Sequence, residues 1–339
     1  MSTGHLIPTH NFHLRHHSAT QSFSTTGLGR SISFMRNGDN RGRFSTAAQI
    51  FLIVCVLFPL IYLVSDRVSL PKALPTSTSN WRNRKAMISS IAQFPAAHLK
   101  NLVLVAGHAV YTGLDFSLAK QESSWFLEPY QKVAGEAQSF IDHIELGVKE
   151  ASNDPEAMLL FSGGQTRQEA GPRSEGLSYW VVAEAASWFG TLGVRNRTFT
   201  EEHARDSFEN LLFGLCRFYE LTGHYPRHIT VISYTLKQDR FSSLHREAVQ
   251  FPSEHFSFIG TPIPPLAKGA LEGEARTVAA FRKDPYGCNG ELQQKRLRRD
   301  PFAVGPIHPS RCPDMKSLLG YCAPTLFTGV LPWVDLVET

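Results

Sequence analysis

An apolar run that ends in two glycines and several polar side chains is the first feature of this sequence that suggests chemistry. In "LLFSGGQTR", Ser162, Gly163 and Gly164 follow three apolar residues, and Thr166 and Arg167 come next. Consecutive glycines can present successive backbone N–H groups to an anion, and an arginine adds a charge-assisted fork. We therefore expect this turn to bind an anionic group, and the alternative is an ordinary tight turn.

Three titratable residues near this turn are candidates for proton transfer. Glu175 opens the next expected helix and Glu201 ends an expected strand, while "AGHAVYTG" supplies Gly107 and His108 after another strand. A carboxylate beside an anion site can act as a base or bind a ligand hydroxyl, and a histidine titrates near neutral pH. We expect Glu175, Glu201 and His108 to be catalytic, with Gly107 allowing close approach of a ligand to the backbone. The alternatives are that Glu175 complements a helix dipole and that His108 bonds a loop carbonyl.

Two cations at the start of an expected helix are the strongest physical indication of a ligand. Lys237 and Arg240 oppose the dipole of that helix, so an anion is expected to compensate them. Ser207 and Asn210 open another expected helix, and we expect them to face the same cleft. All of these positions follow expected strands, so the arrangement of the strands decides whether these residues meet.

Apolar runs and amphipathic stretches alternate five times along the chain. The expected strands are 101–107, 157–164, 197–201, 228–233 and 256–260. The expected helices are 128–150, 174–190, 206–223 and 237–251. This alternation predicts an α/β fold with a mostly parallel sheet of about five strands and helices on both faces. Ligands of such sheets bind beyond the carboxyl ends of the strands, where the candidate residues lie.

Helix-start signals and cysteines add local expectations. Ser174 is expected to cap one helix, and Asp206 with Glu209 reads as a capping box for the next. Cys216 falls in an apolar helix and is expected to be a core thiol. In an oxidising compartment the remaining cysteines outside the apolar segment supply one disulfide; they are Cys288, Cys312 and Cys322. None of the cysteines forms a CxxC pair, so we expect no metal site, and the sequence specifies no cofactor.

The chain divides into segments of different composition. The net charge of +4 over 339 residues is small, which argues against a nucleic-acid partner. We expect a disordered basic tail, a single transmembrane helix, a stem, an α/β domain and a C-terminal extension packed on that domain. These segments are 1–46, 47–64, 65–97, 98–268 and 269–339.

The expected membrane helix, 47–64, carries no charge and is long enough to approach the span of a bilayer. Arginines precede it and charges nearly cancel after it, so the N-terminus is expected in the cytosol and the domain across the membrane. A secretory-pathway membrane is favoured, and Asn196 begins a glycosylation sequon that only that pathway uses. A mitochondrial membrane is the alternative, because the tail is rich in arginine and serine and poor in acids.

Four stretches in order resemble the YdcF-like family, whose bacterial members include SanA-like and ElyC-like proteins. They are "FSGGQTR", "SEG", "EEHARDSFEN" and "SYTLKQDRF". With "AGHAVYTG", "DPYGC" and "KRLRRDPF" the chain looks like a fungal membrane-anchored branch, and the resemblance covers roughly residues 98–335. Asp206 and Ser207 stand where the family usually has Asn and Thr, and Lys237 stands where the bacterial pattern has His. If that His carries a proton, its replacement puts the chemistry in doubt, whereas a lysine serves equally well to contact an anion.

The resemblance implies a Rossmann-like domain, often membrane-anchored, and suggests a phosphorylated or adenosine-containing ligand without fixing a reaction. Two functions follow as hypotheses. One is an enzyme acting on a phosphorylated or nucleotide-like small molecule. The other is a membrane-anchored binding or assembly protein that uses the same pocket without turnover. No Walker loop, nucleophile elbow or HExxH motif decides between them.

Overall fold

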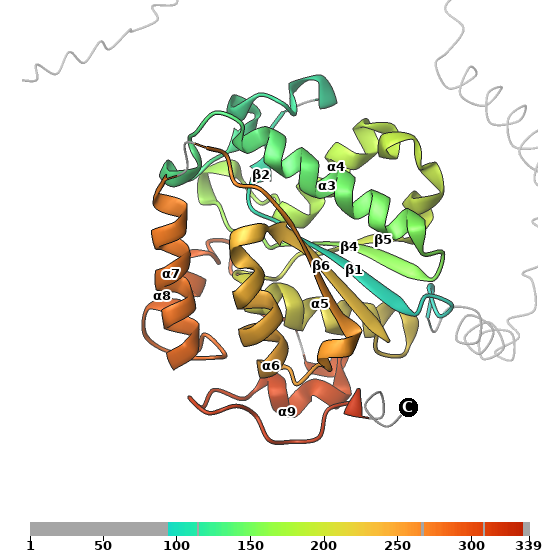
Figure 1. Ribbon diagram of the computed structural model, residues 1–339, viewed down its shortest axis with the longest axis vertical. Coiled ribbons are helices and arrows are strands. Elements are labelled where there is room, and N and C mark those ends of the chain that lie inside the picture. Colours follow the sequence, from blue (N-terminus) through green and yellow to red (C-terminus); the bar gives the residue numbers. More distant parts are fainter. Residues whose placement is uncertain (1–93, 114, 266–267, 308, 335–339) are drawn as a thin grey trace, which may run out of the picture. The chain divides into compact units, whose positions relative to one another are not determined.

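A computed structural model describes residues 94–113, 115–265, 268–307 and 309–334 (Figure 1). The expected tail, the transmembrane helix 47–64 and the stem up to residue 93 lie outside these residues. Within them, no helix combines the length and the apolar composition that crossing a bilayer requires.

Five parallel strands form the central sheet, in the order β5-β4-β1-β6-β7. Their bounds are β1 Asn101–Ala106, β4 Ala157–Ser162, β5 Thr198–Glu201, β6 His228–Tyr234 and β7 Phe256–Thr261. The expected parallel sheet is therefore confirmed. β1 lies at the centre, and the chain adds strands first on its β4 side and then on its β6 side. This reversal leaves a crevice at the carboxyl ends of β1 and β6, where ligands of such folds bind.

Helices cover both faces of the sheet, as the alternation of apolar strand residues requires (Figure 1). α3 (Glu136–Asn153) and α4 (Glu175–Ala185) pack on the face that carries Val103 and Val105. α5 (Ser207–Thr222) packs on the face that carries Leu102 and Leu104. The short α6 (Arg246–Ala248) follows a π-helical segment, Arg240–His245. A small antiparallel pair, β2 (Val110–Tyr111) and β3 (Trp125–Phe126), lies outside the main sheet.

The helix boundaries follow the capping signals with three differences. Ser174 caps α4 and Asp206 caps α5, each by accepting a backbone N–H at 2.9 Å. The carboxylate of Glu209 bonds the N–H of Arg205 rather than that of Asp206, so the capping box is only half formed. α4 ends at Ala185 instead of near residue 190, because left-handed residues follow it. The expected helix 237–251 is interrupted by the π-helical segment Arg240–His245 and ends in the short α6.

The chain beyond residue 268 adds three helices to the domain. They are α7 (Lys268–Lys283), α8 (Gly290–Arg298) and α9 (Lys316–Leu319). Apolar side chains of this extension, including Leu292, Leu318 and Trp333, join the α5 side of the core. α7 and α8 stand together at one side of the domain (Figure 1).

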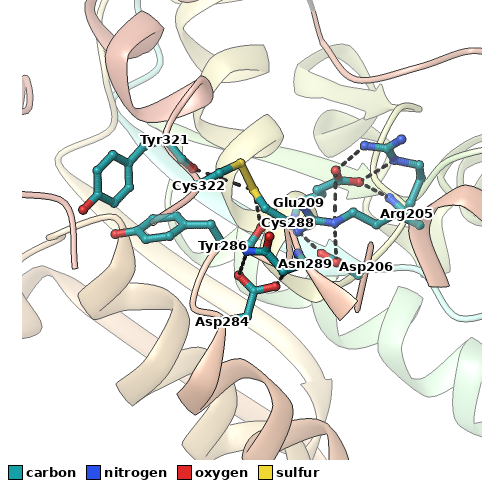
Figure 2. Close-up of a disulfide and its surroundings, with 10 residues drawn as sticks. Arg205, Asp206, Glu209, Asp284, Tyr286, Cys288, Asn289, Tyr321 and Cys322 are labelled. Atoms are coloured by element: carbon teal, nitrogen blue, oxygen red, sulfur yellow. Dashed lines mark hydrogen bonds and ion pairs between the residues drawn. A yellow bond between two sulfur atoms is a disulfide. The ribbon is translucent and has the colours of Figure 1, made fainter. Parts of the chain in front are cut away.

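Two disulfides fasten this extension. Cys216 of α5 pairs with Cys312, and Cys288 pairs with Cys322. The expectation that Cys216 is a core thiol is wrong, because Cys312 of the extension packs directly against α5. Figure 2 shows the second disulfide between the segment that leads into α8 and the C-terminal segment, beside Tyr321. Each bond restricts the unfolded chain, since the paired cysteines lie 96 and 34 residues apart.

Gly176 offers a test of the packing between α4 and the strand ends. A Cβ atom at this position would lie 2.7 Å from the carbonyl oxygen of Phe161 and 2.8 Å from that of Glu201. Gly176→Ala should therefore lower the free energy of unfolding by about 1 to 3 kcal/mol, as overpacking does. Thermal and denaturant unfolding measure this change.

Gly193→Ala is the matched control, because nothing lies within 4 Å of a Cβ there. Its stability should stay near that of the wild type. Equal stability of the two variants would contradict the close packing at Gly176.

Candidate functional site

A cavity of about 820 Å³ opens at the carboxyl ends of the strands. Its walls come from the ends of β1 and β6, the starts of α4 and α5, and the helices α7 and α8. Seven of the residues expected in a site line it. They are Gly107, His108, Glu175, Ser207, Asn210, Lys237 and Arg240.

The glycine turn does not form the expected anion nest. The N–H of Gly163 donates to the carbonyl of Glu201 at 3.0 Å, and the N–H of Gly164 donates to that of Ala204 at 2.7 Å. Both donors thus bond the strand end and loop beside them, and neither glycine lines the cavity. This part of the expectation is wrong, because the turn joins β4 to the loop after β5 instead of facing a ligand.

The glycines serve close packing around Glu175. A Cβ atom on Gly107 or on Gly163 would lie 2.7 Å from the Cβ of Glu175. Their lack of side chains lets α4 start directly against β1 and β4. Glu175 is thereby carried to the cavity wall, where its Oε1 accepts a hydrogen bond from the hydroxyl of Thr166.

Arg167 contacts Glu128 and Glu175 from outside the cavity and does not face a ligand. It is buried and outside the cavity lining. Its Nε lies 3.3 Å from Glu128, and its Nη2 lies 3.7 Å from Glu175. Nη1 donates to the carbonyl and the hydroxyl of Thr166 at 3.1 and 2.9 Å. The predicted role in direct anion binding is therefore not supported by its position.

Glu201 is also placed away from the cavity. Its Oε2 accepts from the hydroxyl of Ser162 at 2.5 Å, and its Oε1 accepts from the N–H groups of His203 and Ala204 at 2.6 and 3.0 Å. Burial raises the pKa of this carboxyl group to about 7, although these hydrogen bonds oppose the shift. The expected catalytic role is corrected, because the carboxylate bridges β4 and the loop after β5. Ser162 likewise stays behind the cavity wall.

The start of α5 contributes two polar groups to the cavity. The amide of Asn210 donates to the carbonyl and hydroxyl oxygens of Ser162, which fixes its orientation. The hydroxyl of Ser207 lies 2.8 Å from Nε2 of His245. Burial, then the nearby charge of Arg240, holds the pKa of His245 well below its usual value, so this histidine is neutral.

Several positive side chains line the cavity, and we call four of them the cation cluster, namely Lys237, Arg240, Lys295 and Arg299. Only Arg240 has a direct carboxylate partner among the described residues, Glu274, at 2.9 Å. Burial is the main cause that lowers the pKa of Lys237 and of Lys295 to about 7, and neighbouring cations lower both further.

Lys295 and Arg299 were not among the predicted ligand-binding residues. A run of charges such as "KRLRR" is most often a solvated face, and contact with lipid headgroups or an anionic ligand is the alternative. No sequence signal placed α8 beside the strand ends, because that position depends on the long-range disulfides and on the packing of the extension.

Beside Lys237, the cavity is lined by His108 and by two residues that were not among the predicted site residues, Glu136 and Tyr234. His108 Nε2 lies 2.6 Å from Nζ of Lys237 and 3.2 Å from the hydroxyl of Ser233. Burial strongly lowers the pKa of His108, so its ring is neutral. The hydroxyl of Tyr234 donates to Glu136 at 3.0 Å, and burial raises the pKa of Glu136. Tyr234 ends β6, so its position at a strand end was the signal that could have identified it.

Among the described residues, no group of three His, Cys, Asp or Glu side chains is arranged to hold a metal ion. The cavity lining instead combines hydroxyl and carboxyl groups with amines and guanidinium groups. This arrangement suits an anionic ligand that also carries hydrogen-bonding groups.

Comparisons with known proteins identify one relative. The uncharacterized protein YOR238W of Saccharomyces cerevisiae is 24% identical over 253 residues, with 59% of this chain and 84% of that protein covered. No protein-family model and no solved structure matches the chain. The name of the yeast protein states no activity, so this likeness carries no functional assignment.

The raised pKa of Glu201 gives a test of its structural role. A carboxyl group with a folded pKa above its unfolded value stabilises the fold fully at low pH, and this contribution is lost as pH rises through about 7. In Glu201→Gln the neutral amide keeps an acceptor and does not ionise. The free energy of unfolding of wild type relative to this variant should therefore fall between pH 4.5 and pH 8, by at most about 3 kcal/mol.

Chemical unfolding of both proteins across this pH range measures the difference. Glu145→Gln, at an exposed position of α3, is the control for a glutamate-to-glutamine change as such. A constant difference between wild type and Glu201→Gln at all pH values would contradict an ionising, buried Glu201.

Proposed function

We propose that this domain binds a phosphorylated or nucleotide-like small molecule in the cavity and acts on it as an enzyme. The observation that carries the proposal is the cation cluster, which brings four Lys and Arg side chains into the cavity lining with one direct carboxylate partner among the described residues. Charges held this close and partly out of water repel one another. An anionic ligand relieves the repulsion, and its negative charge is the missing counterpart.

The carboxylates that line the cavity indicate which other groups the ligand carries. A bare phosphate placed between Glu136, Glu175 and the cation cluster would be repelled by the carboxylates. A ligand that also has hydroxyl groups, such as a ribose or another sugar, would instead donate hydrogen bonds to them. Asn210, already oriented by Ser162, adds a further polar contact.

Enzymatic turnover is supported by titratable groups around the cavity whose pKa values are shifted. Lys237 has a lowered pKa and Glu136 a raised one, and both line the same cavity as the neutral His108. Titratable groups whose environments move their pKa values in opposite directions are typical of catalytic sites.

The alternative is ligand binding without turnover. It is favoured by one observation, namely that Glu201 and the glycine turn, which resemble catalytic elements in the sequence, bond within the fold. Identification of co-purifying small molecules by mass spectrometry, followed by incubation with each of them, separates the two functions by whether a product forms.

We also propose that the protein is a single-pass membrane protein of the YdcF-like family with its domain on the luminal side. The family proposal rests on the four matching stretches, which include Glu175, Ser207, Asn210, Lys237 and Arg240 at the cavity. The luminal proposal rests on the charge asymmetry around 47–64. Two disulfides add support, since such bonds persist in oxidising compartments. A mitochondrial membrane is the alternative location.

Sulfate binding tests the cation cluster, because sulfate keeps a constant charge over the neutral pH range. Protonated lysines attract the anion, so affinity should be greatest below pH 7 and should fall as pH rises through 7. The decrease should approach about tenfold per pH unit for each lysine that loses its proton. Isothermal titration at several pH values measures the affinity.

Lys295→Met should weaken binding about tenfold near pH 6 and reduce the decrease at higher pH. Lys283→Met is the matched control, because Lys283 is exposed on α7 and lies outside the cavity lining. Equal sulfate affinity in the wild type and in Lys295→Met would remove the cation cluster as a binding site.

The orientation is tested by protease protection in sealed microsomes. Residues 94–334 should resist digestion until detergent opens the vesicles. A glycan on Asn196, which is exposed, would support the same orientation independently. Digestion of the domain in intact vesicles would place it in the cytosol and overturn this proposal.

A further inference from the structure

The amine of Lys237 is held in the cavity by contacts that suit a neutral nitrogen as well as a charged one. It lies 2.6 Å from His108 Nε2 and 5.4 Å from the ring centre of Tyr234. Among the described residues, no carboxylate comes within ion-pair distance of this nitrogen. Lysines with a structural role usually pair with an acid, so the partners of Lys237 call for another explanation.

We propose that Lys237 is a nucleophile that forms an imine with the carbonyl group of a phosphorylated aldehyde or ketone. This inference rests on the proposed function and narrows its substrate class. The other members of the cation cluster, Arg240, Lys295 and Arg299, would hold the phosphate, and the carbonyl group would lie at Lys237 on the side of His108.

Three features of the cavity support a nucleophilic amine at this position. Burial is the first, and the adjacent charge of Arg240 is the second; both favour the uncharged amine, as in known imine-forming lysines. The third is the position of Lys237 at the carboxyl end of β6, which points its side chain into the cavity. Lys295 shares a lowered pKa but belongs to α8 and lacks the histidine partner.

The neighbouring groups can move the protons that imine formation requires. His108 is neutral, and its Nε2 faces the Lys237 nitrogen, so it can accept a proton from the attacking amine. Glu136 has a raised pKa and bonds Tyr234, whose ring lies against the same amine. Glu136 is therefore suited to donate a proton to the departing oxygen.

The reaction balances with the ligand as the only other reactant. The lone pair of the uncharged Lys237 nitrogen forms a bond to the carbonyl carbon, and the carbonyl π electrons move to oxygen. One proton passes from nitrogen through His108 to this oxygen, which becomes a hydroxyl group and leaves His108 neutral again. Glu136 then donates a proton to the hydroxyl group, which departs as water while the nitrogen lone pair forms the carbon–nitrogen double bond. The protonated imine returns its remaining N–H proton to the Glu136 carboxylate, so that an amine and a carbonyl give an imine and water.

Reductive trapping with pyridoxal 5′-phosphate as the probe tests this inference. The full chain is incubated with the probe, reduced with borohydride, weighed by mass spectrometry and mapped by peptide analysis. We expect a saturable single adduct on Lys237. Pyridoxal without phosphate should need at least about tenfold more probe for equal labelling, because it lacks the charged contacts to the cation cluster.

Lys237→Arg keeps the positive charge and removes the nucleophilic amine, so it should retain sulfate binding and lose the adduct. Lys283→Arg, at an exposed position outside the cavity lining, keeps the amine at Lys237 and should be labelled like the wild type. Labelling spread over exposed lysines, or unchanged in Lys237→Arg, would overturn the inference. Sulfate binding without any adduct would reject the imine alone, whereas loss of both would reject the proposed function as well.

Discussion

Close contact between the start of α4 and the ends of β1 and β4 is the constraint on which the site depends. Glycines at 107, 163 and 176 remove the side chains that would otherwise keep this helix away. The N-terminus of α4 then lies against the strand ends and carries Glu175 into the cavity wall. Glu201 completes this junction, because its carboxylate joins β4 to the loop that leads to α5. Glu201, Gly163 and Gly164, which the sequence suggested as site residues, thus hold the elements around the cavity in place without lining it.

The second requirement is a wall that brings positive charges to the cavity and limits their contact with water. The extension provides it through α7 and α8, and the disulfides fasten the segments on both sides of α8 (Figures 1 and 2). A cavity formed only by the sheet edge would leave Lys237 and Arg240 more exposed and their charges better screened. The extension therefore changes the chemistry of a strand-end crevice as well as covering it.

The sequence predicted the fold in most respects because its signals were local. Apolar strands, Ser174, Asp206 and Gly223 each act within a few residues, and the structure places all of them as expected. Seven of the twelve candidate site residues reached the cavity by the topological rule for parallel strands alone. The rule identifies the edge of the sheet, but it does not say which way a side chain at that edge points. Glu201 and Arg167 point away from the cavity because each contacts a residue distant in sequence, Ser162 and Glu128 respectively. Lys295 lines the cavity because α8 packs there, and no local sequence pattern predicts the position of α8.

Asp206 links α5 to α8. It caps α5 through Oδ1, and its Oδ2 accepts from Nε of Arg296 on α8 at 2.6 Å. The charge of Arg296 holds the pKa of Asp206 low despite its burial, so the pair is ionised. An asparagine, usual at this position in the family that the sequence resembles, caps a helix equally well but forms no ion pair. Aspartate at this position is therefore suited to a chain in which α8 must be fixed to α5. Lys295 is adjacent to Arg296 in α8, and Arg299 follows Arg296 by about one helical turn. The Asp206–Arg296 ion pair therefore sets the distance between these two members of the cation cluster and the polar groups of α5.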